Sequence, residues 1–310
     1  MSTVAEVTLW GSTIGAVVLD EGSEVARFEY EPKFIQSGIE IAPLTMPLSS
    51  EVYQFTRLAR GTFHGLPGLL SDSLPDKFGN ALIDTWLATQ GREPRSVNAV
   101  ERLCYMGNRG MGALEFLPAQ GPIANAAQAI HVDALVALAS EILTHREALS
   151  TSLADNSKKQ QALKQILQIG TSAGGARAKA VIAWNPETNE VRSGQVKAAE
   201  GFSYWLLKFD GVSGNKDKEL EDPKGYGVIE YAYYKMAEDA GLVMNECRLL
   251  QENGRQHFVT QRFDRLDNGD KLHMQSLCAM AHYDFNMAGA YSYEQAIHVI
   301  KKLQLGMDAI

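Results

Sequence analysis

A helical pattern gives way to a run of strands across the glycine-rich sequence Gly170-Thr171-Ser172-Ala173-Gly174-Gly175-Ala176-Arg177-Ala178-Lys179. Glycines let a backbone wrap closely around a phosphate and point its N–H groups at it. The spacing from Gly170 to Gly175 is similar to that of a P-loop, but Ala176 stands where that motif requires a lysine. Arg177 and Lys179 favour an anion as the ligand. Taken alone, this sequence fits a flexible hairpin about as well as a phosphate-binding loop.

Strand-like sequences dominate the C-terminal side of this loop. They predict strands at 178–184, 191–197, 204–209, 247–250 and 257–262. One helix is predicted between them, from Gly227 to Ala240, and Gly241 is a residue that commonly ends a helix. Two helical patterns, at 132–143 and 160–169, precede the loop. Strands, one helix and strands again indicate an α+β fold rather than a doubly wound parallel sheet.

The first 118 residues predict a small antiparallel sheet with helices. Strand-like sequences lie at 7–10, 14–19 and 25–30, and the first turn is predicted at Gly11-Ser12-Thr13. A helix start is predicted at Ser49-Ser50-Glu51. Prolines and glycines predict an irregular segment over 66–79, before a helix over 81–89.

Composition and charge exclude several classes of protein. The 310 residues are 45% hydrophobic and 21% charged, which is typical of a globular chain. The net charge of −8 argues against unaided binding to nucleic acid or to an anionic membrane. No apolar run reaches the roughly 20 residues of a membrane span, and no secretion signal is visible. Cys104, Cys247 and Cys278 are too scattered for a disulfide framework or a cysteine zinc site, so we expect a cytoplasmic protein.

One lysine, Lys208, interrupts an apolar strand that reads Tyr204-Trp205-Leu206-Leu207-Lys208-Phe209. Such a lysine can be an edge residue that prevents aggregation between strands. It can also hold the phosphates of a nucleotide, oriented by a carboxylate of the next helix, where Glu230 is the candidate. Taken alone, the sequence favours the edge residue.

Another strand breaks into the charged sequence Gln261-Arg262-Phe263-Asp264-Arg265. The backbone groups at its end could bind a ligand such as adenine, with Phe263 packed on the ring. The alternative is a surface turn whose local Arg–Asp pair contributes little energy. Taken alone, the sequence favours the surface turn.

These motifs, in this order, resemble one family: the HipA-like serine/threonine kinases, toxins of bacterial type II toxin–antitoxin systems. The resemblance runs from about Val7 to the last residue. It is carried by the sequences Leu66-Pro67-Gly68-Leu69-Leu70-Ser71-Asp72-Ser73-Leu74-Pro75-Asp76, Thr171 to Arg177, Leu206 to Phe209, Gln261 to Arg265 and Leu272 to Met280. It implies an α+β fold with an N-terminal domain at 1–118, a helical connector at 119–160, and an incomplete kinase-like domain, an N-lobe and a partial C-lobe, at 161–310.

The resemblance also implies a role for the glycine-rich loop. Ser172 is expected to be an autophosphorylated serine, and Gly174 and Gly175 are expected to belong to the phosphate loop. Phosphorylation of Ser172 would add nearly two negative charges where the loop must accept the phosphates of ATP. We therefore expect it to inactivate the kinase.

Four further residues are implied to face the nucleotide. Lys208 is expected to contact the phosphates of ATP, with Glu230 as its partner on the helix. Gln261 and Phe263 are expected at the adenine hinge. Gln261 departs from the family, which often has Glu there; a backbone contact survives this change, but a carboxylate role does not.

The family's catalytic residues have no counterpart here. A kinase needs a catalytic Asp, an Asn nearby and a second Asp on Mg²⁺, and in this family they lie in an Asp-His-x-Lys-Asn-like loop and at a later Asp. No such loop occurs between Gln295 and Ile310, and the Asp and Asn of His282-Tyr283-Asp284-Phe285-Asn286 lie too early. We expect a family member that ends before its catalytic loop, without catalytic residues or Mg²⁺ ligands, and no phosphate transfer by this chain alone.

Two functions follow as expectations. The first is a kinase whose full form transfers the γ-phosphate of ATP to a serine of a translation-related protein, such as an aminoacyl-tRNA synthetase. The second is a non-catalytic module that binds a HipB-like antitoxin, a small DNA-binding dimer, so that nucleic acid is reached only indirectly and no membrane is involved. Residues 1–150 hold 17 acidic and 10 basic side chains, a net charge of −7 that suits a basic partner. A metabolite kinase of an unrelated family would also need the missing catalytic residues.

Overall fold

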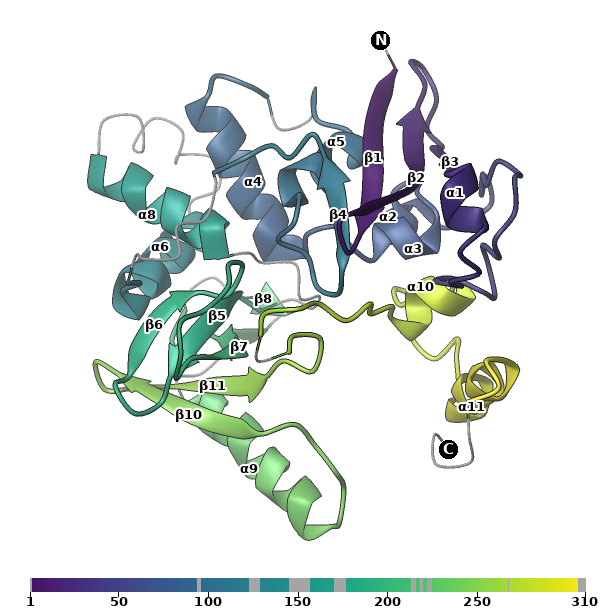
Figure 1. Cartoon of the computed structure of the whole chain (residues 1–310). Helices are drawn as coiled ribbons and strands as arrows, with labels where there is room; N and C mark the ends of the chain where they lie inside the picture. The colour runs from purple at the N-terminus through teal and green to yellow at the C-terminus, as the bar shows by residue number, and fades with distance from the viewer. Residues whose placement is uncertain are drawn as a thin grey trace.

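Two larger antiparallel sheets, one separate two-stranded pair and their helices make up the part of the chain that the computed structural model describes (Figure 1). This part comprises residues 2–93, 96–122, 129–144, 157–169, 177–212, 216–217, 220–221, 225–266 and 268–305. No helix within it is long and apolar enough to cross a membrane.

The first sheet has the strand order β3-β2-β1-β4. Its strands are β1 (Thr3–Leu9), β2 (Ser12–Leu19), β3 (Arg27–Tyr30) and β4 (Leu114–Leu117). The turn between β1 and β2 lies at Trp10 and Gly11, with φ of 49° and 76°, so the turn predicted at residues 11–13 is placed one residue too late. Two-residue hairpin turns commonly require positive φ at both positions, and glycine accepts it without strain.

Five helices belong to the same N-terminal part of the chain as this sheet. They are α1 (Pro32–Ile35), α2 (Arg60–Phe63), α3 (Gly68–Ser71), α4 (Lys77–Thr89) and α5 (Ala99–Met106). The helix start predicted at residue 49 is wrong, because Tyr53 instead forms an isolated β-bridge with Phe28. The segment 66–79 is less irregular than predicted, since it contains α3 and the first turn of α4.

The second sheet has the order β10-β11-β7-β5-β6, and every neighbouring pair is antiparallel. Its strands are β5 (Lys179–Asn185), β6 (Glu190–Ser193), β7 (Ser203–Lys208), β10 (Cys247–Glu252) and β11 (Arg255–Gln261). The five predicted strands are confirmed, although β6 ends at Ser193 rather than Lys197. The short strands β8 (Lys216–Asp217) and β9 (Leu220–Glu221) form a separate pair.

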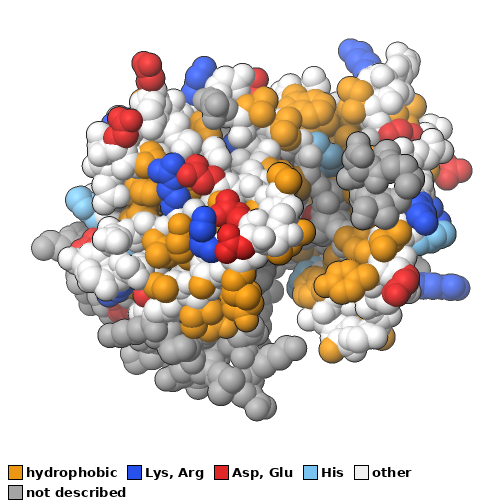
Figure 2. Space-filling model, turned by 90° about the horizontal axis from the view of Figure 1, so that it is seen from below, with side chains coloured by type: hydrophobic (Ala, Val, Ile, Leu, Met, Phe, Trp, Pro, Cys, Tyr) orange, Lys and Arg blue, Asp and Glu red, His pale blue; other side chains and the backbone are white. Residues whose placement is uncertain are grey.

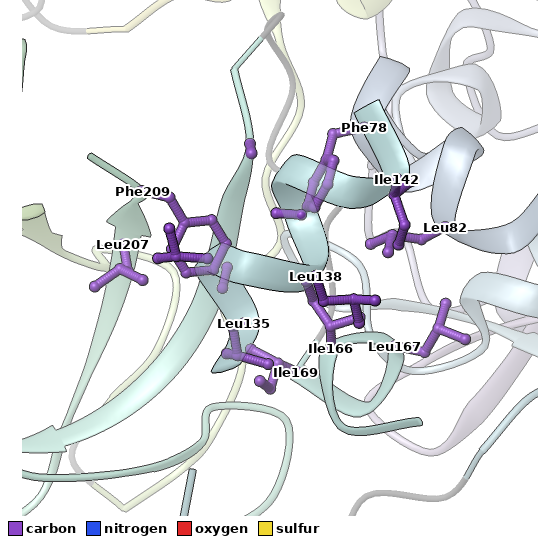
Figure 3. Packing of buried hydrophobic residues seen from close by; sticks show 14 of the residues in the cluster. Phe78, Leu82, Leu135, Leu138, Ile142, Ile166, Leu167, Ile169, Leu207 and Phe209 are labelled. Carbon is purple, nitrogen blue, oxygen red and sulfur yellow. The ribbon is translucent and has the colours of Figure 1, made fainter. Parts of the chain in front are cut away.

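Helices cover this sheet. The helix α9 (Tyr226–Asp239) packs on β10 and β11. The predicted helices before the glycine-rich loop are α6 (Val132–Thr144) and α8 (Ser157–Ile169). Their apolar side chains meet those of α4 and of β7 in one core, which includes Phe78 and Leu82 from α4 (Figure 3). The helix α4 therefore ties the N-terminal part of the chain to the second sheet.

The chain after β11 returns to the N-terminal part. It forms α10 (Leu277–Ala281) and α11 (Tyr293–Lys302), and α10 packs on α3 (Figure 1). Seen from below, apolar side chains gather on the exposed face of the molecule (Figure 2). Exposed large apolar residues of α9 and of the segment around α11 include Ile229, Tyr233, Met236, Phe285, Met287 and Tyr293.

Candidate functional site

A short ion pair joins the second sheet to α9. The Nζ of Lys208, the last residue of β7, lies 2.6 Å from Oε2 of Glu230. The lysine side chain keeps 34% of its surface exposed, so it can still reach a ligand. Lys208 lies in a middle strand, paired on both sides by β5 and β11, so it is not an edge residue. The pairing with Glu230 expected from the sequence is present.

A second cation shares the same carboxylate. The Nη1 of Arg177 lies 3.2 Å from Oε1 of Glu230, and the guanidinium carbon lies 3.3 Å from the centre of the Tyr226 ring. Stacking on an aromatic face fixes a guanidinium in place. Two cations therefore surround one carboxylate, close to the start of β5. The loop residues Ser172, Gly174 and Gly175 lie outside the described part of the chain.

The backbone N–H groups at the end of β11, near Gln261, have hydrogen-bond partners within the protein. The backbone N–H of Gln261 donates to the carbonyl of Glu246, and that of Arg262 donates to the carbonyl of Tyr204, both at 2.8 Å. The prediction that this strand end leaves its backbone groups free is therefore wrong for these two donors. Phe263 is 58% exposed, so its side chain is accessible to a partner.

The charged residues after Gln261 are buried, so the predicted surface turn is wrong. Asp264 has no exposed surface and accepts hydrogen bonds from Arg262 at 2.8 and 2.6 Å and from the backbone N–H of Gly112 at 2.7 Å. Arg265 donates to the carbonyls of Gly112 and Gly110. These bonds, led by those from Arg262, outweigh burial and hold the pKa of Asp264 below its ordinary value. The sequence could not show this cluster because Gly112 lies 152 residues away.

Both acidic residues of the 66–76 motif reach across to the second half of the chain. Oδ2 of Asp76 lies 2.8 Å from Nζ of Lys179, with both side chains buried. Asp72 accepts two hydrogen bonds from Ser276. Sequence reasoning missed these partners, and the only signal was the presence of acidic residues in a segment otherwise rich in apolar and turn-forming residues.

Asp284 and Asn286 have a structural role in this arrangement. The hydroxyl of Thr62 donates to Asp284, and the amide of Asn286 donates to Thr62 at 2.8 Å. Both side chains therefore contact the N-terminal part of the chain. Among the described residues, no group of three His, Cys, Asp or Glu side chains is placed to hold a metal ion.

Comparison with known protein families covers both halves of the chain. The HipA N-terminal domain matches residues 5–117, and the HipA-like C-terminal domain matches residues 171–309. The chain belongs to the HipA-like family. The family that the sequence motifs resemble is thereby confirmed. No curated protein matches the chain.

The HipA-like fold is also found among solved structures. A chain in the complex of HipA, HipB and operator DNA from the Shewanella oneidensis MR-1 toxin–antitoxin system matches with a TM-score of 0.50 and 17% sequence identity. The match covers 91% of the present chain and 57% of the solved chain. The α+β, kinase-like HipA fold expected from the sequence is thereby confirmed, and the present chain spans a little over half of that protein's length.

Proposed function

We propose that this chain is the nucleotide-facing part of a HipA-type serine/threonine kinase toxin and that it binds the phosphates of ATP. The observation that supports this most is the cluster of Lys208, Glu230 and Arg177, of which Arg177 directly follows the glycines in the sequence. Kinases orient the lysine that contacts ATP through such an ion pair between a strand and a helix. A lysine that is 34% exposed but held by a carboxylate is poised to donate to phosphate oxygens.

Each residue of the site has a part in this proposal. Lys208 and Arg177 attract and orient phosphate oxygens, and Glu230 keeps both cations aimed at one place. The open ring of Phe263, with side-chain or carbonyl atoms of Gln261, faces the adenine. Ser172, with Gly174 and Gly175, belongs to the loop that accepts phosphate. Phosphorylation of Ser172 places nearly two negative charges in that loop and inactivates the toxin by repulsion.

The proposal for this chain concerns the binding of ATP and not the transfer of its phosphoryl group. ATP supplies the phosphoryl group in the full kinase, whose substrate is a serine of a translation-related protein such as an aminoacyl-tRNA synthetase. In the part of the chain that the structure describes, no group of three His, Cys, Asp or Glu side chains is placed to hold a metal ion, and no Asp-His-x-Lys-Asn-like loop occurs between Gln295 and Ile310. We therefore derive no metal-dependent step for this chain, and we expect it to bind nucleotide without transferring phosphate.

The test is the affinity of the purified 310-residue chain for ATP, measured by calorimetry, with Lys208→Ala as the variant. Lys235→Ala is the matched control, because Lys235 also lies 2.6 Å from a glutamate, Glu238. Its side chain is 54% exposed and it lies nearer the end of α9 than Glu230 does. Loss of binding in Lys208→Ala alone supports the proposal. Equal affinities in all three proteins reject it, and so does a wild-type chain that binds no ATP.

A second function is favoured by the solved relative, which was determined with HipB and operator DNA. We propose that the present chain binds a HipB-like antitoxin and meets DNA only through it. The acidic N-terminal part, with a net charge of −7 over residues 1–150, suits a basic partner. Co-purification with a HipB-like protein tests this, and the proposal requires a complex that persists without ATP.

A further inference from the structure

Lys179 and Lys208 face each other across neighbouring strands. They are direct partners in the antiparallel register of β5 and β7, so their side chains leave the same face of the sheet. Like charges placed directly opposite each other destabilise a sheet. Each lysine has its own carboxylate: Glu230 lies 2.6 Å from Lys208, and Asp76 lies 2.8 Å from Lys179.

The two carboxylates come from different parts of the chain. Glu230 belongs to α9, but Asp76 belongs to the segment that matches the HipA N-terminal domain. Oδ1 of Asp76 also accepts the backbone N–H of Gly79 at 2.7 Å, so Asp76 caps the start of α4. The side chains of Asp76 and Lys179 are only 2% and 4% exposed. The Asp76 carboxylate is therefore buried and held in place by two partners, the N–H of Gly79 and the ammonium of Lys179.

Lys179 connects the Asp76 carboxylate to the cluster of Arg177, Glu230 and Lys208. Two residues before it lies Arg177, which binds Glu230, and Glu230 binds Lys208. The carbonyl of Ala178, between them, accepts the N–H of Phe209, the residue after Lys208. The start of β5 is therefore linked to both cations of the site, because Arg177 precedes it in the chain and Lys208 lies opposite Lys179 on β7.

We propose that Asp76 is a positioning residue for the phosphate site: the N-terminal domain, through the Asp76–Lys179 ion pair, holds the start of β5 so that Arg177 and Lys208 converge on one ligand. The nature of that ligand rests on the proposed function. Removal of the Asp76 charge takes away the carboxylate that lies 2.8 Å from the buried Lys179 ammonium, and breaking one side of a buried ion pair is strongly destabilising, so we expect the start of β5 to shift. The pairing thus makes the geometry of the phosphate site depend on the N-terminal domain.

The test uses Asp76→Asn, which can still cap α4, and the double variant Asp76→Asn with Lys179→Gln, which replaces two charges by two amides. Asp72→Asn is the matched control, because Asp72 is an acidic residue of the same motif that joins the N-terminal domain to a different element, α10. The first readout is ATP affinity. The second is amide hydrogen exchange of peptides that cover residues 177–184 and 203–209, which requires no ligand.

We expect Asp76→Asn to weaken ATP binding about tenfold and the double variant to recover most of that loss. We expect Asp72→Asn to leave the affinity unchanged. Asp76→Asn should also speed exchange in the two peptides, whereas Asp72→Asn should not. If Asp76→Asn does not fold, Asp76→Glu, which keeps the charge but displaces it, should weaken ATP binding in a folded protein.

The outcomes separate this inference from the proposed function. The inference is overturned if the wild-type chain binds ATP and Asp76→Asn binds ATP as tightly as the wild type. The same holds for Asp76→Glu where it is used in place of Asp76→Asn. It is also overturned if exchange in the two peptides does not change, or if Asp72→Asn reproduces every effect. If no protein binds ATP but exchange rises only in the Asp76 variants, the positioning role stands and the proposed ligand is wrong.

Discussion

Asp72 accepts hydrogen bonds from both the backbone N–H and the hydroxyl of Ser276, each at 2.6 Å, although 204 residues separate them in the sequence. Ser276 is the N-cap of α10, and its hydroxyl oxygen also accepts the N–H of Ala279. One carboxylate from the N-terminal part thus fixes the start of a helix from the C-terminal part. This contact holds α10 against α3.

Replacement of Asp72 by alanine should destabilise the fold. Burial raises the pKa of Asp72 even though the bonds from Ser276 lower it, so desolvation offsets part of their strength. We expect the free energy of unfolding to fall by about 2 kcal/mol, measured by urea denaturation. The control is Asp20→Ala, which breaks an exposed pair with Arg27 and should cost less than about 1 kcal/mol. Equal losses in the two variants would contradict the role given to Asp72.

Gly68 should not tolerate a side chain, because α10 approaches its backbone directly. A Cβ at this position would lie 2.3 Å from the carbonyl oxygen of Ala279 and 2.5 Å from the ring of His282. We expect Gly68→Ala to lower the unfolding free energy by about 1–3 kcal/mol through overpacking, measured as a lower thermal midpoint. The control is Gly61→Ala in α2, where a Cβ meets open space and should be neutral or stabilising. A Gly68→Ala midpoint at or above the wild-type value would show that α10 does not dock here.

Glu230→Gln tests whether the carboxylate orients the site or competes with phosphate. The amide can still accept a hydrogen bond from Lys208, but it no longer neutralises two cations, and we expect them to move apart. ATP binding should weaken about tenfold, as judged by calorimetry. Glu238→Gln, which changes the partner of Lys235 on the same helix, should have no effect. Tighter ATP binding by Glu230→Gln would show competition instead of orientation.

His257 should make the fold sensitive to mild acid. It is fully buried, and burial lowers its pKa from 6.5 to about 4. Between these two values the unfolded chain binds more protons than the folded chain, so the unfolding free energy falls as the pH drops through this window. Above pH 6.5 the stability is fully present. The loss from this residue reaches at most about 3 kcal/mol near pH 4.

Urea midpoints measured from pH 7.5 to pH 4.5 check this expectation. His257→Gln should show a shallower slope than the wild type. Part of the slope should remain, because burial also lowers the pKa of His282 to about 4. Identical slopes would show that His257 does not remain neutral in the folded protein.

The strands of the second sheet were predictable because each one carries its own signal. A run such as Tyr204 to Leu207 is apolar on both faces, which is a local signal for a strand inside a sheet. The helix start predicted at Ser49 failed for the opposite reason. Its local capping pattern was overridden by the bridge from Tyr53 to Phe28, which becomes visible only when the chain folds back.

The candidate site also combines one contact that could be predicted before the structure was known with another that only the fold reveals. A lone lysine in an apolar strand and a glutamate in the following helix are separated by only 22 residues, and the family resemblance, rather than the residue types alone, implied that they pair. The residues that hold this pair in place, Asp76 and Lys179, are 103 residues apart and carry no periodic pattern that would link them. A buried ion pair forms only where packing excludes water around both charges. The amino-acid order therefore indicates which groups pair at the candidate site, whereas only the fold brings Asp76, at the start of α4, to Lys179 of β5.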